Sequence, residues 1–160
     1  MPADGLAARV RRAIAGAPDA GEAVRLAVRE IHDSSDRHDW TGVYLMEGRG
    51  ELVLSHFIGE PTPHTRIPLD RGVCGAAARL KETIIVPDVA ADSRYLACSF
   101  STRSEIVVPI MKGGTVYGEI DIDSHTPDAF DHLDRRELEQ VADLLAERLS
   151  ERPAERRAEA

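Results

Sequence analysis

Apolar residues recur every three or four positions near both ends of the chain, which is the spacing of one buried face of a helix. The three apolar stripes consist of Leu6, Val10 and Ile14; of Val24, Ala27, Val28 and Ile31; and of Leu138, Val141, Leu145 and Leu149. Asp19 and Glu22 precede the second stripe with the spacing of a capping box. The pattern predicts two N-terminal helices and a C-terminal helix that begins at about Asp131.

Between these helices, short apolar runs alternate with turn residues, which predicts strands. The expected strands are 40–46, 51–57, 83–86, 105–111 and 115–123, with at most a short strand at 66–68. A helix of small residues should follow Gly72, and the long connections 58–72 and 87–102 read as loops of the kind that often carry function. The order of elements predicts an α/β (α+β) fold, with a central, mostly antiparallel sheet flanked by N- and C-terminal helices.

The length of 160 residues fits one domain with a sizeable core. We expect a single domain over residues 1–152, with a helical segment at 4–33 and a core at 40–149. Residues 153–160 are charged and small, and we expect this tail to be frayed. No repeat and no linker divides the sequence.

The charge balance narrows the choice of partners. Asp and Glu total 28 against 20 Lys and Arg, and no basic run could track phosphates, so we expect no nucleic-acid partner. No apolar stretch approaches the ~18 residues of a membrane span. The arginine-containing N-terminus lacks the continuous apolar segment of a signal peptide. The sequence therefore predicts a cytoplasmic protein with no membrane partner.

The last predicted strand carries a row of carboxylates. Strict alternation divides it into two faces, Val116, Gly118, Ile120 and Ile122 on one and Tyr117, Glu119, Asp121 and Asp123 on the other. Carboxylates spaced at roughly 7 Å repel one another. The row is either a solvent face, where water screens the repulsion, or a site for a cation or an ammonium group. Glu105 begins the neighbouring strand and adds a further carboxylate.

The chain has two cysteines, and a reducing compartment disfavours a permanent disulfide between them. Cys74 follows Gly72 near a helix N-terminus, where the helix dipole would lower the thiol pKa; the alternative is a small residue packed in the core. Cys98 lies in a polar loop between Arg94 and Arg103, which favours a reactive thiol. The sequence has no CxxC and no paired histidines, so the usual zinc patterns are missing.

Trp40 and Tyr44 lie four residues apart on one predicted strand and therefore on one face of it. Core packing is the common reason for such a pair. An aromatic box around an apolar or sulfur-bearing group is the alternative.

Six ordered segments together resemble the free methionine-(R)-sulfoxide reductases, a family of stand-alone GAF domains. The segments are Trp40–Leu45, Thr65–Pro68, Arg71–Gly75, Ala97–Cys98, Arg103–Pro109 and Asp121–Ser124. The resemblance runs from about Trp40 to Leu149 and implies a GAF-like fold. It also implies an enzyme that reduces free L-methionine-(R)-sulfoxide to L-methionine.

The resemblance assigns roles to individual residues. Cys98 matches the cysteine that becomes a sulfenic acid, and Cys74 matches the second cysteine, which would close a disulfide with it. The substrate-binding positions match Trp40, Tyr44, Glu105, Asp121 and Asp123. The helix dipole alone favours Cys74 as the attacking thiol, and we follow the resemblance in choosing Cys98. A thioredoxin-like partner supplied by NADPH would regenerate the thiols, with no bound cofactor and no metal, in a protein that we expect to be a homodimer.

Two positions depart from the family pattern. His64 stands where family members commonly carry a third cysteine, so that Cys74 is the only thiol left to pair with Cys98. Glu119 stands where the family usually has an apolar residue. Loss of the third cysteine also fits a GAF-domain sensor that binds a small molecule without turnover, and a dimerisation scaffold is a third interpretation.

Overall fold

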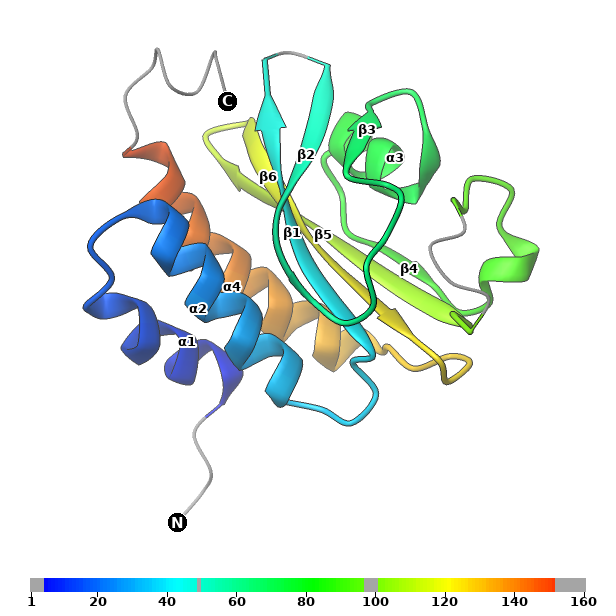
Figure 1. The fold of residues 1–160 in the computed structure, drawn as a ribbon, viewed down its shortest axis with the longest axis horizontal. Coiled ribbons are helices and arrows are strands. Elements are labelled where there is room, and N and C mark those ends of the chain that lie inside the picture. Colours follow the sequence, from blue (N-terminus) through cyan, green and yellow to red (C-terminus); the bar gives the residue numbers. More distant parts are fainter. Residues whose placement is uncertain (1–4, 49, 97–100, 152–160) are drawn as a thin grey trace.

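The computed structural model describes residues 5–48, 50–96 and 101–151. Two helices come first, a sheet with one inserted helix follows, and a long helix ends the described chain (Figure 1). In chain order the elements are α1 (Leu6–Ala15), α2 (Ala20–Asp33), β1 (Trp40–Glu47), β2 (Glu51–Ile58), β3 (Arg66–Pro68), α3 (Gly72–Leu80), β4 (Ile84–Val86), the 3₁₀ turn η1 (Val89–Ala91), β5 (Ser104–Lys112), β6 (Thr115–Ser124) and α4 (His132–Ser150).

The strands form one sheet in the order β3-β2-β1-β6-β5-β4, and every neighbouring pair is antiparallel. This confirms the predicted α+β fold class. Strands β1 and β6 lie at the centre of the sheet, and their register places Trp40 opposite Asp123 and Tyr44 opposite Glu119. The two segments that carried the aromatic and acidic motifs in the sequence are therefore direct neighbours.

Helices α2 and α4 cover one face of the sheet, and α1 packs against these two helices on the side away from the sheet (Figure 1). The apolar stripes of the three helices join residues of β1, β5 and β6 in one large hydrophobic core. Helix α2 begins at the predicted cap, where Asp19 accepts a hydrogen bond from the Glu22 amide. Helix α4 begins at the predicted position, where Asp131 forms a capping box with Asp134. Helix α4 is also hydrogen-bonded to the end of α1, because the Arg148 guanidinium donates to the main-chain carbonyls of Ile14 and Ala17.

The opposite face of the sheet is covered by α3 and by the long connections around β3 and η1 (Figure 1). A second, smaller hydrophobic core lies there, between α3 and the central strands. Helix α3 approaches the chain after β3 so closely that a Cβ on Gly75 would lie 2.7 Å from the Leu69 carbonyl oxygen. Gly75 therefore permits the close approach between α3 and the chain that follows β3.

A bulge near the start of β6 reverses part of the predicted alternation. Ile110 pairs with Gly118 but Met111 pairs with Val116, so Tyr117 is an extra residue in β6. As a result, Val116 packs on the α3 face and Tyr117 packs on the face of the terminal helices. The prediction that placed Tyr117 with the carboxylates was wrong, because strict alternation does not allow for a bulge.

Other expectations have different outcomes. Strand β3 has the predicted limits, and the connection at 87–102 contains a short 3₁₀ turn, η1. The division into a single domain over 1–152 stays a prediction, and the tail 153–160 lies outside the described residues. Among the described helices, none is both long enough and apolar enough to cross a membrane.

Candidate functional site

The acidic row on β6 is buried beneath α3. Glu119, Asp121 and Asp123 are exposed by only 0%, 2% and 2%. The solvent-face interpretation of this row is therefore wrong, since α3 and the adjoining connections cover the sheet at this point. What remains of the two predicted alternatives is a buried site in which closely spaced carboxyl groups meet.

Strand β5 supplies the fourth acidic residue. Glu105 is directly opposite Asp123 in the antiparallel register and is 4% exposed. Residues opposite one another in such a pair project from the same face of the sheet, so Glu105 joins the row on β6. Pro109 lies opposite Glu119 in the same register.

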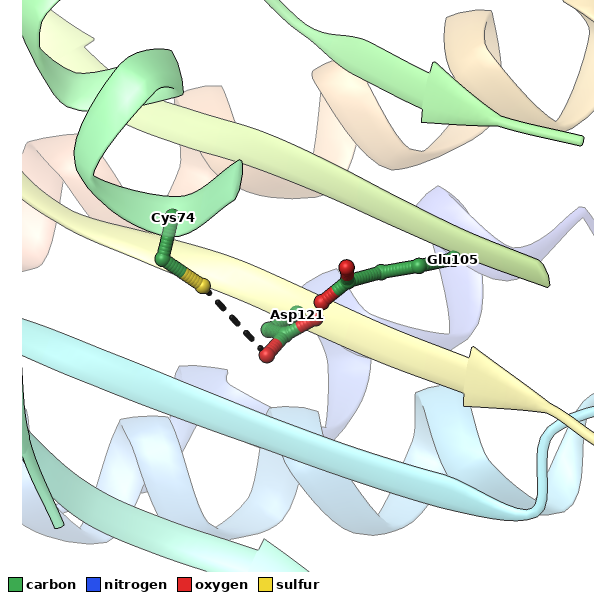
Figure 2. Close-up of side chains that lie close together, drawn as sticks. All are labelled: Cys74, Glu105 and Asp121. Carbon is green, nitrogen blue, oxygen red and sulfur yellow. Dashed lines mark hydrogen bonds between the residues drawn. The ribbon is translucent and has the colours of Figure 1, made fainter. Parts of the chain in front are cut away.

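Cys74 reaches this acidic row from the first turn of α3. Its thiol donates a hydrogen bond to Asp121 Oδ2 at 3.4 Å (Figure 2). In the same view the Glu105 side chain extends from β5 toward Asp121. One potential ligand atom each from Cys74, Glu105 and Asp121 lies within 4.8 Å of the others. Helix α3 and the β5–β6 hairpin, which are far apart in the sequence, thus bring a thiol and two carboxyl groups together.

The surroundings oppose negative charge. Burial, and then the charges of Asp121, Glu119 and Glu105, hold the pKa of the Cys74 thiol well above its usual range. Burial likewise raises the pKa values of Glu119, Asp121 and Asp123, with the charge of Asp121 adding to the effect at Glu119 and Asp123. The expectation that the helix dipole lowers the Cys74 pKa was wrong, because desolvation and three nearby carboxyl groups outweigh it.

Several carboxyl oxygens in this site have no protein partner among the described residues. They are both oxygens of Glu119, Oδ1 of Asp121 and Oδ1 of Asp123. Buried polar atoms are nearly always hydrogen-bonded in native proteins, and such exceptions mark places where a ligand, an ion or water belongs. The site is thus built to receive donors or positive charge.

The predicted aromatic pair lies on the same face as the carboxyl groups. The Trp40 and Tyr44 ring centroids are 6.4 Å apart, with the rings tilted by 35°. The Trp40 indole N–H donates to the Glu60 carbonyl at 3.0 Å, and the Tyr44 hydroxyl donates to the His64 carbonyl at 2.7 Å. Phe57, to which the sequence analysis gave no role, stacks on Trp40 at 5.7 Å and is 39% exposed.

Gly42 makes room for the indole. A Cβ on Gly42 would lie 2.7 Å from Cζ3 of Trp40, so the ring lies directly over this glycine. The cross-strand neighbours of Gly42 are Asp121 on one side and Phe57 on the other. The Trp40 ring therefore occupies the surface between them. Gly42 belonged to a recognised segment, but only the sheet register gives it this function.

A small cavity of about 20 Å³ lies between α3 and the sheet. Its lining includes Tyr44, His64, Cys74, Leu96, Glu105 and Asp121. Trp40 and Asp123 are not among its lining residues, although both belong to the same face. Cys98, the predicted attacking thiol, lies outside the described residues. The roles predicted for all these residues stay predictions.

The fold and the buried site together correspond to a known class. The pattern of the GAF domain matches residues 19–149, and the chain belongs to this family. Within it, the chain is 43% identical over 110 residues to the Saccharomyces cerevisiae protein named free methionine-R-sulfoxide reductase. That match covers 67% of this chain and 61% of the yeast protein, which is less than two thirds of the relative's own length.

Solved structures of similar proteins match this chain over nearly its whole length. The free methionine-R-sulfoxide reductase from Neisseria meningitidis, determined in complex with its substrate, superposes with a TM-score of 0.84 at 34% identity and covers 94% of this chain and 93% of that one. A protein from Burkholderia vietnamiensis described as a GAF sensor superposes with a TM-score of 0.83 at 35% identity, covering 96% and 93%.

Proposed function

We propose that this protein is a thiol-dependent oxidoreductase that reduces free L-methionine-(R)-sulfoxide to L-methionine. One observation carries the proposal: the thiol of Cys74, four buried carboxyl groups and two aromatic rings share one face of the sheet beneath α3. Similarity to reductases of this name in yeast and Neisseria meningitidis supports the same activity.

The chemistry of the site fits a free amino acid. An ammonium group would neutralise the carboxyl groups of Glu105, Asp121 and Asp123 and would supply donors to the unpartnered Oδ1 atoms of Asp121 and Asp123. Trp40 and Tyr44 offer aromatic surface to a methylthio group, which packs well against such rings. A peptide-bound methionine sulfoxide lacks the free ammonium, so it would leave the buried charges uncompensated.

In the proposed reaction, the Cys98 thiolate attacks the sulfoxide sulfur and takes over its oxygen. With the uptake of one proton the products are methionine and a Cys98 sulfenic acid. A buried carboxyl group whose pKa is raised can supply that proton, and Asp121 and Asp123 both meet this condition.

Cys74 then condenses with the sulfenic acid, which releases water and forms a Cys74–Cys98 disulfide. The Cys74 thiol must lose its proton in this step, and Asp121, which already accepts its hydrogen bond, is placed to receive it. A thioredoxin-like dithiol would reduce the disulfide by exchange and restore both thiols. With His64 in place of a third cysteine, Cys74 is the resolving thiol in this scheme.

Substrate binding requires the site to open. A volume of about 20 Å³ is close to that of one water molecule, far less than methionine sulfoxide occupies. Leu96 and His64 line the cavity and lie on the two long connections rather than on strands. These connections are the elements that can move without disturbing the sheet.

The alternative is a sensor that binds methionine or its sulfoxide without turnover. The raised pKa of the buried Cys74 thiol, which withholds the thiolate, favours it, and a protein described as a GAF sensor is among the similar structures. A Cys98→Ser variant separates the two functions. If the protein is a sensor, the variant keeps its affinity for the ligand and there is no turnover to lose. If the protein is a reductase, the variant loses turnover.

The test is a coupled assay with thioredoxin, thioredoxin reductase and NADPH, in which free L-methionine-(R)-sulfoxide and its (S) epimer are offered separately. We expect NADPH consumption with the (R) epimer alone. Turnover should vanish in Cys98→Ser and weaken in Cys74→Ser, while Glu82→Gln, an exposed carboxylate change, should have no effect. No turnover with either epimer, even with dithiothreitol, would refute the reductase and leave the binding module.

The cytoplasmic location and the homodimer stay predictions.

A further inference from the structure

We infer that Cys74, Glu105 and Asp121 form a binding site for a single zinc-class divalent cation, in the pocket proposed above for the amino acid. The cation and the amino acid would then exclude one another. The exclusion rests on the proposed function, whereas the metal site does not. The acidic row suggested a cation site in the sequence, but Cys74 could not be assigned to it, because the three residues lie on α3, β5 and β6 and form no spaced motif.

The first argument is geometric. Tetrahedral zinc with Zn–S and Zn–O bonds of about 2.3 and 2.0 Å places the sulfur and the oxygen about 3.5 Å apart. Cys74 Sγ and Asp121 Oδ2 are 3.4 Å apart, and one Glu105 oxygen completes a group whose members all lie within 4.8 Å of one another. The hydrogen bond between thiol and carboxylate therefore spans nearly the distance of one edge of a zinc coordination tetrahedron.

The second, independent argument is Glu119. Its side chain is completely buried, both of its oxygens lack a partner among the described residues, and it lies beside Cys74 on the same face as Asp121. Glu119 is not one of the three proposed ligands, so its burial is a separate observation. A carboxyl group there can accept a hydrogen bond from water on the cation or enter as a fourth ligand. A cation or its bound water would supply the partner that the described protein atoms do not give to the Glu119 oxygens.

The chemistry of the ligands selects the metal class. A thiolate prefers borderline and soft ions such as Zn²⁺ over Ca²⁺ or Mg²⁺, which prefer oxygen ligands and more of them. The adjoining cavity of about 20 Å³ accommodates one ion or water but no amino acid. Three protein ligands leave the remaining coordination position to water or to an incoming group.

The experiment titrates Co²⁺, a coloured substitute for Zn²⁺, into metal-free Cys98→Ser protein kept reduced with a phosphine. Cys74 is then the only thiol, since the chain has two cysteines. We expect a thiolate-to-cobalt charge-transfer band in the near ultraviolet that saturates at one equivalent and is bleached by one equivalent of Zn²⁺. Zn²⁺ should also raise the melting temperature of this protein.

Matched variants in the same background locate the site. Replacing Cys74 with Ser should abolish the band, and Asp121→Asn should weaken cobalt binding at least about tenfold. Glu119→Gln should weaken it by about 10- to 100-fold, as is typical for a group that supports the ligands. Glu82→Gln should bind as tightly as the parent. Circular dichroism establishes that each variant is folded.

Two results would overturn the metal site: no charge-transfer band at saturating Co²⁺, or Zn²⁺ binding of equal affinity after Cys74→Ser, which would place the metal on other carboxylates. Methionine or its sulfoxide should bleach the cobalt band by competition. A strong band that neither compound alters upholds the metal site and refutes the shared pocket. This readout needs no turnover, so it is independent of whether the reductase assay succeeds.

Discussion

Replacing Glu119 with leucine should stabilise the protein, although the site is fully buried. The carboxyl group has no hydrogen-bond partner among the described residues, and its cross-strand neighbours are Tyr44 and Pro109. Leucine is of similar size and needs no partner. The change removes a buried polar group without opening a large cavity, which is the situation in which such replacements increase stability.

The magnitude has two parts. An unpaired buried polar group costs about 1–3 kcal/mol, and leucine removes this cost at any pH. The second part depends on pH, because burial raises the Glu119 pKa well above 4.5 in the folded protein while the unfolded chain titrates normally. The stability that the group contributes is present below about pH 4.5 and is lost as pH rises toward the folded pKa. The loss is about 1.4 kcal/mol per pH unit in that window.

Urea unfolding at pH 5.0, 6.5 and 8.0, followed by circular dichroism, measures both parts. The free energy of unfolding of Glu119→Leu should exceed that of the wild type at each pH, and the gap should widen as pH rises. Asp121 and Asp123 also have raised pKa values, and the charge of Asp121 is one cause of the raised Glu119 pKa. Because this repulsion is mutual, Glu119→Leu also relieves it at Asp121, which widens the gap in the same direction as pH rises.

Two controls separate the parts. Glu119→Gln removes the titration but keeps an unpaired polar group, so its advantage should grow with pH but start from a smaller value. Glu82→Gln, at an exposed position, should show neither effect. A gap between wild type and Glu119→Leu that does not change with pH would refute a buried carboxyl with a raised pKa. A less stable leucine variant would refute the claim that its oxygens are unpaired.

Two further predictions concern the aromatic surface and the thiol. Gly42→Ala should displace the indole of Trp40, the only tryptophan, and cost about 1–3 kcal/mol of stability. The Trp40 fluorescence spectrum should shift in this variant but not in Gly50→Ala, where a Cβ meets open space. An unshifted spectrum of Gly42→Ala would contradict the packing of the indole over Gly42. In Cys98→Ser protein at pH 8, iodoacetamide should alkylate Cys74 at least about tenfold more slowly in the native state than in urea, because burial and a raised pKa both withhold the thiolate. Equal alkylation rates in the two states would contradict a buried, protonated thiol.

Local signals in the sequence are sufficient for most of the fold. The apolar stripes place α1, α2 and α4, because a helix that packs on a sheet must repeat its apolar residues every three or four positions. Turn residues around β3 define even that three-residue strand. The bulge at Tyr117 escapes such reasoning, since the extra residue appears only when β6 is paired with β5.

The site was less accessible to sequence reasoning for a related cause. The acidic row that contains Asp121 has the same sequence pattern whether it faces water or is buried. The residues of the row therefore do not indicate which element covers them. The covering element is α3, whose Gly75 permits contact with the chain after β3 and thereby brings Cys74 onto Asp121. Once this helix is in place, desolvation decides the chemistry: it overrides the helix dipole at Cys74 and leaves Glu119 without a partner. The properties that distinguish an acidic surface from a binding site therefore depend on the packing of one short helix, far from the acidic row in sequence.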